Sequence, residues 1–150
     1  MTNIYYDNHY VGTRTDFDTT RKSRDIAEYI QGYPNSNISI IEPSAISLRN
    51  SESLIHSMHD YEYSNALHSG QSRALAESQG FTWDEGIWNM AVHSTAGVLN
   101  AIHDAVTTAP STFGSPDYGW SRNAGENIHG SLSSGLHHAR PNYGKGFCTV

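Results

Sequence analysis

The sequence predicts an α/β fold with a mostly parallel β-sheet. Short β-prone runs alternate with segments whose apolar residues recur at helical spacing, and this alternation is typical of parallel strands joined by helices. One run, Ile38–Ile41, lies between polar segments and is followed by Glu42-Pro43, which is the pattern of a strand buried within a parallel sheet. With 150 residues, the chain is long enough to enclose a core in one domain.

The first two expected elements are a strand and a helix. Asn3–Tyr6 is a short β-prone run. The segment Thr19–Ile30 places its apolar residues on one side of a helix, and Gly32 and Pro34 follow it. Glycine and proline at these positions end a helix, so we expect the helix to end before the buried strand at Ile38–Ile41.

Three further helices are expected before residue 108. Ser51–Met58 and Asp60–Leu67 are interpreted as two short helices. The third runs from about Gly86 to Thr107 and has a broad apolar side. Thr82-Trp83-Asp84-Glu85 has the form of a capping box in front of it. Gly97, inside this helix, costs about 1 kcal/mol relative to alanine, so we expect close packing against a neighbour there.

A long loop and a last strand follow. Ala109–Gly130 is rich in Pro, Gly, Ser and Asn, and a loop of this length is usually either functional or disordered. Ser131–Leu136 is interpreted as a short strand that ends just before His137 and His138. Ligands of parallel sheets bind beyond the C-terminal ends of the strands. The two histidines therefore lie where a site is expected.

Composition argues against several partners and locations. The net charge is -6 and no cluster of five or more Lys/Arg occurs, so we expect no nucleic-acid partner. The N-terminus lacks the basic and apolar regions of a signal peptide. No apolar run approaches the roughly 20 residues that span a bilayer, so no membrane association is expected.

Cys148 is the single cysteine, which excludes an internal disulfide and fits a reducing compartment. We therefore expect a cytoplasmic protein.

His137 and His138 are the candidate catalytic residues. In a turn that leaves a strand, neighbouring side chains can converge on one pocket, although in a continuing strand they point to opposite faces. Two imidazoles in a pocket can serve as general base and general acid near neutral pH. Taken alone, a His-His pair is weak evidence for catalysis and favours a role on the surface or in packing.

The segments around this pair resemble a known family. Gly135-Leu136-His137-His138-Ala139 and, after a short loop, Gly146-Phe147-Cys148 are similar to the signature of the histone deacetylase and acetylpolyamine amidohydrolase superfamily. Four earlier segments resemble further stretches of that family, in the same order: Phe17–Lys22, His59–Tyr63, Phe81–Gly86 and Ser94–Gly97. The first of these resembles a bacterial histone deacetylase-like branch. The resemblance covers most of the chain, with the specific motifs in its last stretch.

The resemblance implies a zinc-dependent amidohydrolase that acts on acetylated lysine or polyamine amines. The implied fold is an arginase-deacetylase-like parallel sheet flanked by helices, of which residues 1–150 form the N-terminal portion as a single, incomplete domain. Carried over, His138 is the main general base and His137 assists it in handling protons. Gly146 and Phe147 line the narrow channel for the acyl-lysine or acyl-amine stem.

The zinc of that family has no ligands in this chain. In the family, an Asp-x-His and a later Asp hold the ion, and they lie downstream of the tandem histidines. A catalytic zinc site needs three protein ligands and an open position, so residues 1–150 are expected to require a C-terminal half for activity. The alternative is a truncated, non-catalytic module that acts in binding or self-assembly, because a half-sheet leaves an open edge and an apolar face.

The spacing of the other histidines predicts no metal site. His56 and His59 are three positions apart and would share a helix face, but two histidines are fewer than three ligands, and a partly buried face is the preferred interpretation. His93 and His103 fall on the long helix, where exposure on the polar side is expected. The remaining ones are scattered along the chain: His9, His68 and His129. No metal ligand is therefore assigned.

Overall fold

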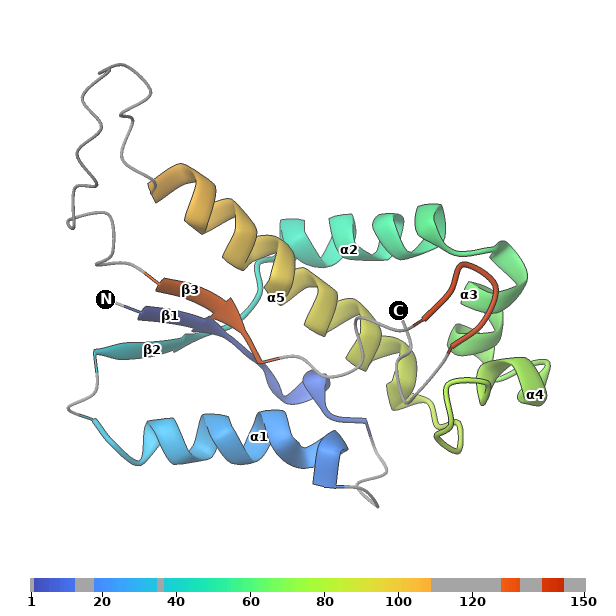
Figure 1. Cartoon of the computed structure of the whole chain (residues 1–150), viewed down its shortest axis with the longest axis horizontal. Coiled ribbons are helices and arrows are strands. Elements are labelled where there is room, and N and C mark those ends of the chain that lie inside the picture. The colour runs from blue at the N-terminus through green and yellow to red at the C-terminus, as the bar shows by residue number, and fades with distance from the viewer. Residues whose placement is uncertain (1, 13–17, 35–36, 109–127, 133–138, 145–150) are drawn as a thin grey trace, which may run out of the picture.

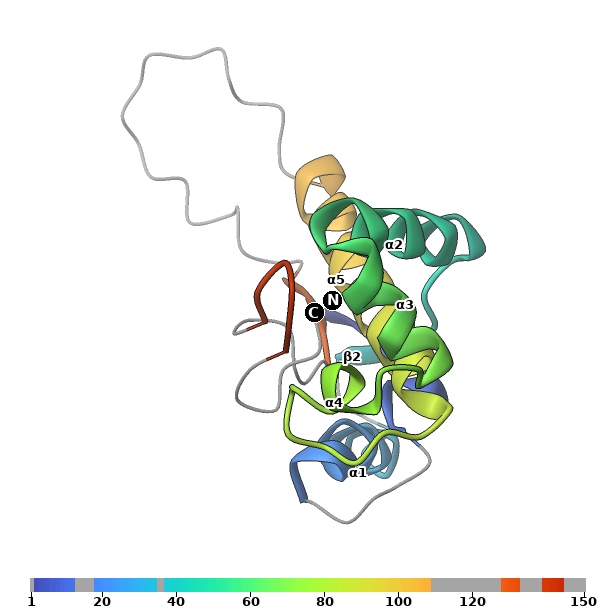
Figure 2. The ribbon, with the colours of Figure 1, turned by 90° about the vertical axis from the view of Figure 1, so that its right-hand side faces the viewer.

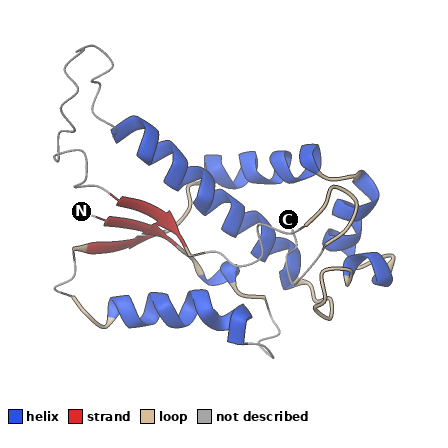
Figure 3. Ribbon diagram, in the orientation of Figure 1, coloured by secondary structure: helices blue, strands red, loops and turns tan. Residues whose placement is uncertain are grey.

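The computed structural model describes residues 2–12, 18–34, 37–108, 128–132 and 139–144. It shows an α/β fold in which a three-stranded parallel sheet is packed against helices (Figure 1; Figure 3). The strands are β1 (Thr2–Tyr5), β2 (Ile38–Ile41) and β3 (Ile128–Ser131). The helices are the 3-10 helix η1 (Asn8–Tyr10), α1 (Asp18–Gln31), α2 (Ala45–Met58), α3 (Tyr61–Ser69), α4 (Arg73–Ala76) and α5 (Gly86–Thr108). The predicted α/β class with a parallel sheet is confirmed.

The central strand of the sheet is β1, in the order β2-β1-β3. Both of its pairings are parallel and start at the first residue of each strand. Backbone hydrogen bonds continue the pairings just past the strands, from Tyr6 N to Ile41 O at 2.9 Å and from Leu132 N to Tyr5 O at 3.1 Å. The C-terminal ends of all three strands therefore meet at one edge of the sheet, which we call the C-terminal edge.

Helices cover both faces of the sheet. α1 lies along one face, and α5 crosses the other face in contact with β1 and β3 (Figure 1; Figure 2). α2 packs against α5, α3 contacts both of these helices, and α4 packs against α3. Two apolar clusters result from this layering. One lies between α1 and the sheet around Tyr6, Tyr10 and Ala27, and the other lies between α2, α3 and α5 around Leu67 and Trp88.

The long helix α5 meets η1 and β3 at a glycine. A Cβ atom on Gly97 would overlap the hydroxyl of Tyr10 and would lie 2.5 Å from Ser131 Oγ, so the close packing predicted at this position is confirmed. The C-terminal part of the predicted apolar side is different, because Ile102 and Val106 are exposed. In the described part of the chain, no helix combines the length and the apolar character needed to cross a membrane.

The helix predicted from Ser51 begins earlier in the structure. α2 starts at Ala45 because Ser44 caps it, with its hydroxyl accepting a hydrogen bond from Ser47 N at 3.1 Å. Side-chain oxygens at this position satisfy one of the free N–H groups of a first helical turn. α2 and α3 are separate helices, as predicted, and α4 is a short element that the sequence did not predict.

The start of α5 differs from the prediction in its cap. The residues from Thr82 to Asp84 are not helical, so the predicted capping box led by Thr82 is wrong. Asp84 caps the helix instead, because its Oδ1 accepts a hydrogen bond from Gly86 N at 2.6 Å. The long helix itself matches the predicted range to within one residue at its C-terminal end.

The last described strand also begins earlier than predicted. β3 runs from Ile128 to Ser131, whereas a strand was expected from Ser131 to Leu136. The physical reason is its parallel pairing along all four residues of β1. Residues 128–130 are therefore strand rather than the end of the long loop. Residues 109–127 and 133–136, on which the rest of both predictions falls, lie outside the described residues.

Candidate functional site

The residues predicted to act in catalysis and substrate binding are His137, His138, Gly146 and Phe147, and all four lie outside the described residues. The structure does describe the strand that leads toward them. β3 runs parallel to β1 and ends at the C-terminal edge of the sheet. The roles assigned to these four residues stay predictions.

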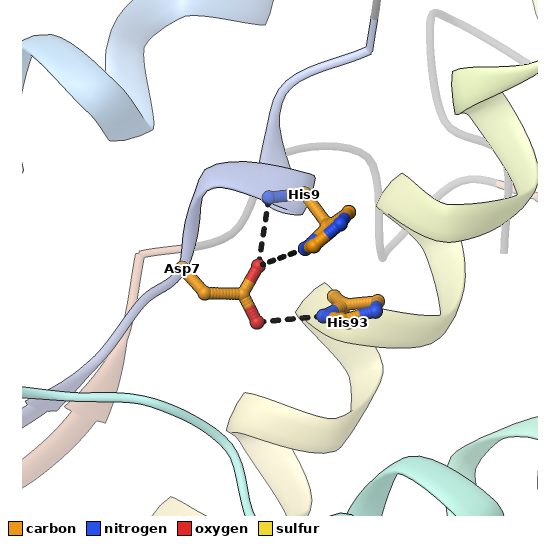
Figure 4. A group of neighbouring side chains, drawn as sticks. All are labelled: Asp7, His9 and His93. Carbon is orange, nitrogen blue, oxygen red and sulfur yellow. Dashed lines mark hydrogen bonds and ion pairs between the residues drawn. The ribbon is translucent and has the colours of Figure 1, made fainter.

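Three polar side chains from two separate parts of the chain meet just past the C-terminal end of β1 (Figure 4). Asp7 follows β1 and caps η1, because its Oδ1 accepts a hydrogen bond from His9 N at 2.7 Å. His9 lies on η1 itself, and His93 projects toward it from α5. We call Asp7, His9 and His93 the Asp-His cluster.

The carboxylate of Asp7 bridges the two imidazoles of the cluster. Its Oδ2 lies 2.6 Å from His93 Nδ1, and its Oδ1 lies 3.3 Å from His9 Nδ1. The two rings are stacked, with centroids 4.3 Å apart and planes inclined by 29°. The side chains of Asp7 and His93 are 11% and 18% exposed, whereas that of His9 is 58% exposed. His9 is therefore the solvent-facing member of a cluster that is otherwise largely enclosed.

The surroundings of Asp7 favour its charged form. Burial alone raises the pKa of the Asp7 carboxyl, but hydrogen bonds from the His93 ring and from the His9 backbone N–H, with the charges of both imidazoles, hold this pKa below its usual value. Asp7 is therefore ionised at neutral pH. An ionised carboxylate only accepts hydrogen bonds, so His93 Nδ1 donates the proton of the 2.6 Å bond.

Tyr10 fixes the backbone from which the cluster projects. Its ring is buried, and its hydroxyl lies 3.1 Å from Ser131 Oγ at the end of β3. Gly97 of α5 leaves the room for that hydroxyl. Burial raises the pKa of Tyr10, so the group remains a neutral hydroxyl at physiological pH. η1 is thereby held between the sheet and α5, just past the C-terminal end of β1.

A second polar group joins the sheet to α5. The hydroxyl of Tyr5 donates to Asp104 Oδ2 at 2.5 Å, and His129 Nδ1 lies 3.5 Å from the same oxygen. Burial and the adjacent carboxylate raise the pKa of Tyr5 to about 12. The His129 side chain is 5% exposed. Because these groups face one another across the helix-sheet interface, we assign them a role in holding α5 on the sheet.

The histidine pair considered from its spacing does not form a shared site. His56 Nδ1 lies 3.1 Å from Ser64 Oγ, and His59 Nδ1 lies 3.0 Å from the backbone oxygen of Arg140. His59 is the C-terminal cap of α2 rather than a member of its face. Within the residues that the structure describes, the group of three or more possible metal ligands is the Asp-His cluster.

Sequence reasoning missed this cluster. His103 is exposed as predicted, but the exposure predicted for His93 is wrong, because η1 lies over that part of α5 and Asp7 bonds to its ring. One signal was available, since Asp7 directly follows the predicted strand Asn3–Tyr6 at a position where parallel sheets hold ligands. Nothing in the sequence pairs Asp7 with a histidine on a helix so far along the chain.

Comparison with known protein families, with curated proteins and with solved structures gives no match. Function is therefore inferred from the motifs of this sequence and from the geometry of the described residues.

Proposed function

We propose that the chain is the N-terminal portion of a zinc-dependent, deacetylase-like amidohydrolase that removes acetyl groups from acetylated lysine or polyamine amines. One observation carries the proposal. The Gly135-Leu136-His137-His138-Ala139 motif follows β3, a parallel strand that ends at the C-terminal edge of the sheet, and sites of open parallel sheets form at that edge. The proposed finer fold is an arginase-deacetylase-like sheet, with β2, β1 and β3 as its N-terminal strands.

In this proposal His138 is the main general base. It accepts a proton from the water that attacks the acyl carbonyl, and a proton then passes to the leaving amine with the help of His137. Zinc, when bound, supplies the polarisation of the carbonyl and of the water. The ligands of the family lie downstream of the motif, so none of the residues here is assigned to that ion. Gly146 and Phe147 form walls of the channel, where an aromatic ring packs well against a methylene stem.

The test is hydrolysis of an acetylated lysine peptide and of an acetylated polyamine by a polypeptide that joins these residues to the downstream zinc ligands. The His138→Ala variant is expected to lose about 10²–10⁴-fold in kcat, as removal of a general base does. His103→Ala is the matched control, because His103 is an exposed histidine on α5. Full activity in His138→Ala would show that this residue is not the base.

A second candidate is a non-catalytic module that self-associates. Within the described residues, β2 and β3 each pair with β1 alone, and exposed sheet edges favour pairing with another chain. Large apolar side chains are also exposed on the helices that pack against each other above the sheet: Ile46 and Met58 on α2, and Ile102 and Val106 on α5. Light scattering of the 150-residue chain is expected to give a dimer or larger, and a folded monomer would contradict this candidate.

A further inference from the structure

We propose that Asp7, His9 and His93 form a site for a divalent transition metal ion, with Zn²⁺ as the preferred occupant. The site uses none of the residues assigned to the proposed deacetylase function, and it does not depend on that function. It also revises the assignment of no metal ligand that the spacing of the histidines gave.

The donor set of the cluster matches zinc chemistry. Imidazole nitrogen and carboxylate oxygen are ligands of Zn²⁺, and three protein ligands with one open position describe the zinc sites that keep a water molecule. One ligand atom from each of the three residues lies within 4.8 Å of the others. Tetrahedral ligands at about 2.1 Å from an ion lie about 3.4 Å from one another. The separation of 3.3 Å between Asp7 Oδ1 and His9 Nδ1 already has that value.

The protein holds the ligands before any ion arrives. The backbone N–H of His9 fixes the Asp7 carboxylate, and this carboxylate in turn orients the His93 ring. The hydrogen bond from His9 N to Asp7 can remain when an ion binds, and outer hydrogen bonds of this kind orient the ligands and raise metal affinity.

One adjustment accompanies binding. Asp7 Oδ2 and His93 Nδ1 are 2.6 Å apart because a proton joins them. When the ion replaces that proton, His93 Nδ1 moves away from Oδ2 to the spacing of a zinc ligand beside Asp7 Oδ1. The stacked rings must also rotate so that the ion enters the plane of each. The His9 side chain is 58% exposed, so its ring has room to turn toward the ion.

The experiment uses the untagged chain and Co²⁺ as a spectroscopic substitute for Zn²⁺. Four- or five-coordinate Co²⁺ with imidazole ligands absorbs visible light much more strongly than the hydrated ion does. We expect such a band to saturate at one Co²⁺ per chain and to be abolished by Zn²⁺. Zinc titration calorimetry should give the same stoichiometry.

Variants identify the ligands. His9→Ala removes an exposed side chain, so it should fold normally, and it is expected to weaken Zn²⁺ binding by more than the roughly 10–100-fold that loss of a supporting residue causes. His93→Ala should do the same, with circular dichroism as the check on folding. His103→Ala, on the exposed side of α5, should bind Zn²⁺ as the wild-type chain does.

Two results would overturn the proposal. One is the absence of a visible Co²⁺ band and of zinc binding in the wild-type chain. The other is binding that survives in His9→Ala and in folded His93→Ala but disappears when His137 and His138 are both replaced by alanine, because the ion would then belong to the tandem histidines.

Discussion

The replacement of Gly97 by alanine tests how α5, η1 and β3 are packed around the candidate site. The new methyl group would occupy the space of the Tyr10 hydroxyl and would approach Ser131 Oγ. To relieve the overlap, η1 must move away from α5, and the hydrogen bond between these two hydroxyls, now 3.1 Å long, is strained or lost. The variant is therefore expected to be less stable than the wild-type chain.

The size of the effect follows from three contributions. Overpacking a close contact costs about 1–3 kcal/mol, and loss of a hydrogen bond costs about 0.5–1.5 kcal/mol. Alanine is better than glycine inside a helix by about 1 kcal/mol, which opposes the other two. The free energy of unfolding should therefore fall by about 2 kcal/mol, given the middle of each range.

Urea unfolding followed by circular dichroism measures this free energy. Gly130→Ala is the matched control, because no atom lies within 4 Å of a Cβ placed on Gly130, and alanine in a strand is expected to be neutral or stabilising by up to about 1 kcal/mol. In the Tyr10→Phe background the atom nearest to the new methyl group is gone, so Gly97→Ala should be less harmful there. Equal or greater stability of the single variant Gly97→Ala would refute the described packing.

Two further predictions concern the interior and a helix cap. The pKa of Tyr5 is raised from 10.0 to about 12. Its neutral hydroxyl therefore contributes stability that is fully present below pH 10 and is lost as the pH rises toward 12. Tyr5→Phe should show a weaker decline of unfolding free energy across that window, and an unchanged decline would argue against the bond to Asp104. Ser44→Ala removes the cap of α2 and should lower the unfolding free energy, measured in urea, by about 0.5–2 kcal/mol. The control is Ser57→Ala, which should change this free energy little, because the Ser57 hydroxyl bonds to a carbonyl within the exposed end of the same helix.

Local patterns were sufficient to predict much of the fold. Ile38–Ile41 was correctly placed as a strand because a short apolar run between polar segments leaves few alternatives. Its predicted burial was wrong, because Ile38 is exposed and, within the described residues, β2 pairs with β1 alone at the edge of the sheet. The range of α5 followed from apolar residues that recur over many turns. The start of α2 was missed because its first turns contain exposed Ile46 and show little amphipathic pattern, although Ser44 was a capping signal in the sequence. The extent of β3 depends on its pairing with β1, which no local pattern encodes.

The candidate site could be predicted much less well. The tandem histidines were singled out by their motif, and the structure leaves their roles as predictions. The Asp-His cluster joins the end of β1 to the middle of α5, so it exists only once α5 has crossed the sheet. A sequence shows which residues have chemistry to offer, but the crossing of a helix over a strand decides which of them meet. Gly97, which permits that approach to Tyr10, was the one sequence feature that marked the crossing.

We have proposed that these residues belong to an enzyme that hydrolyses acetyl amides. The most direct measurement is acetate release from an acetylated lysine peptide and an acetylated polyamine by a zinc-loaded polypeptide that contains residues 1–150 and the downstream ligand segment. We predict repeated turnover with at least one of the two substrates, and its abolition by a zinc chelator. No acetate release from either substrate by the folded, zinc-loaded polypeptide would contradict the proposed function.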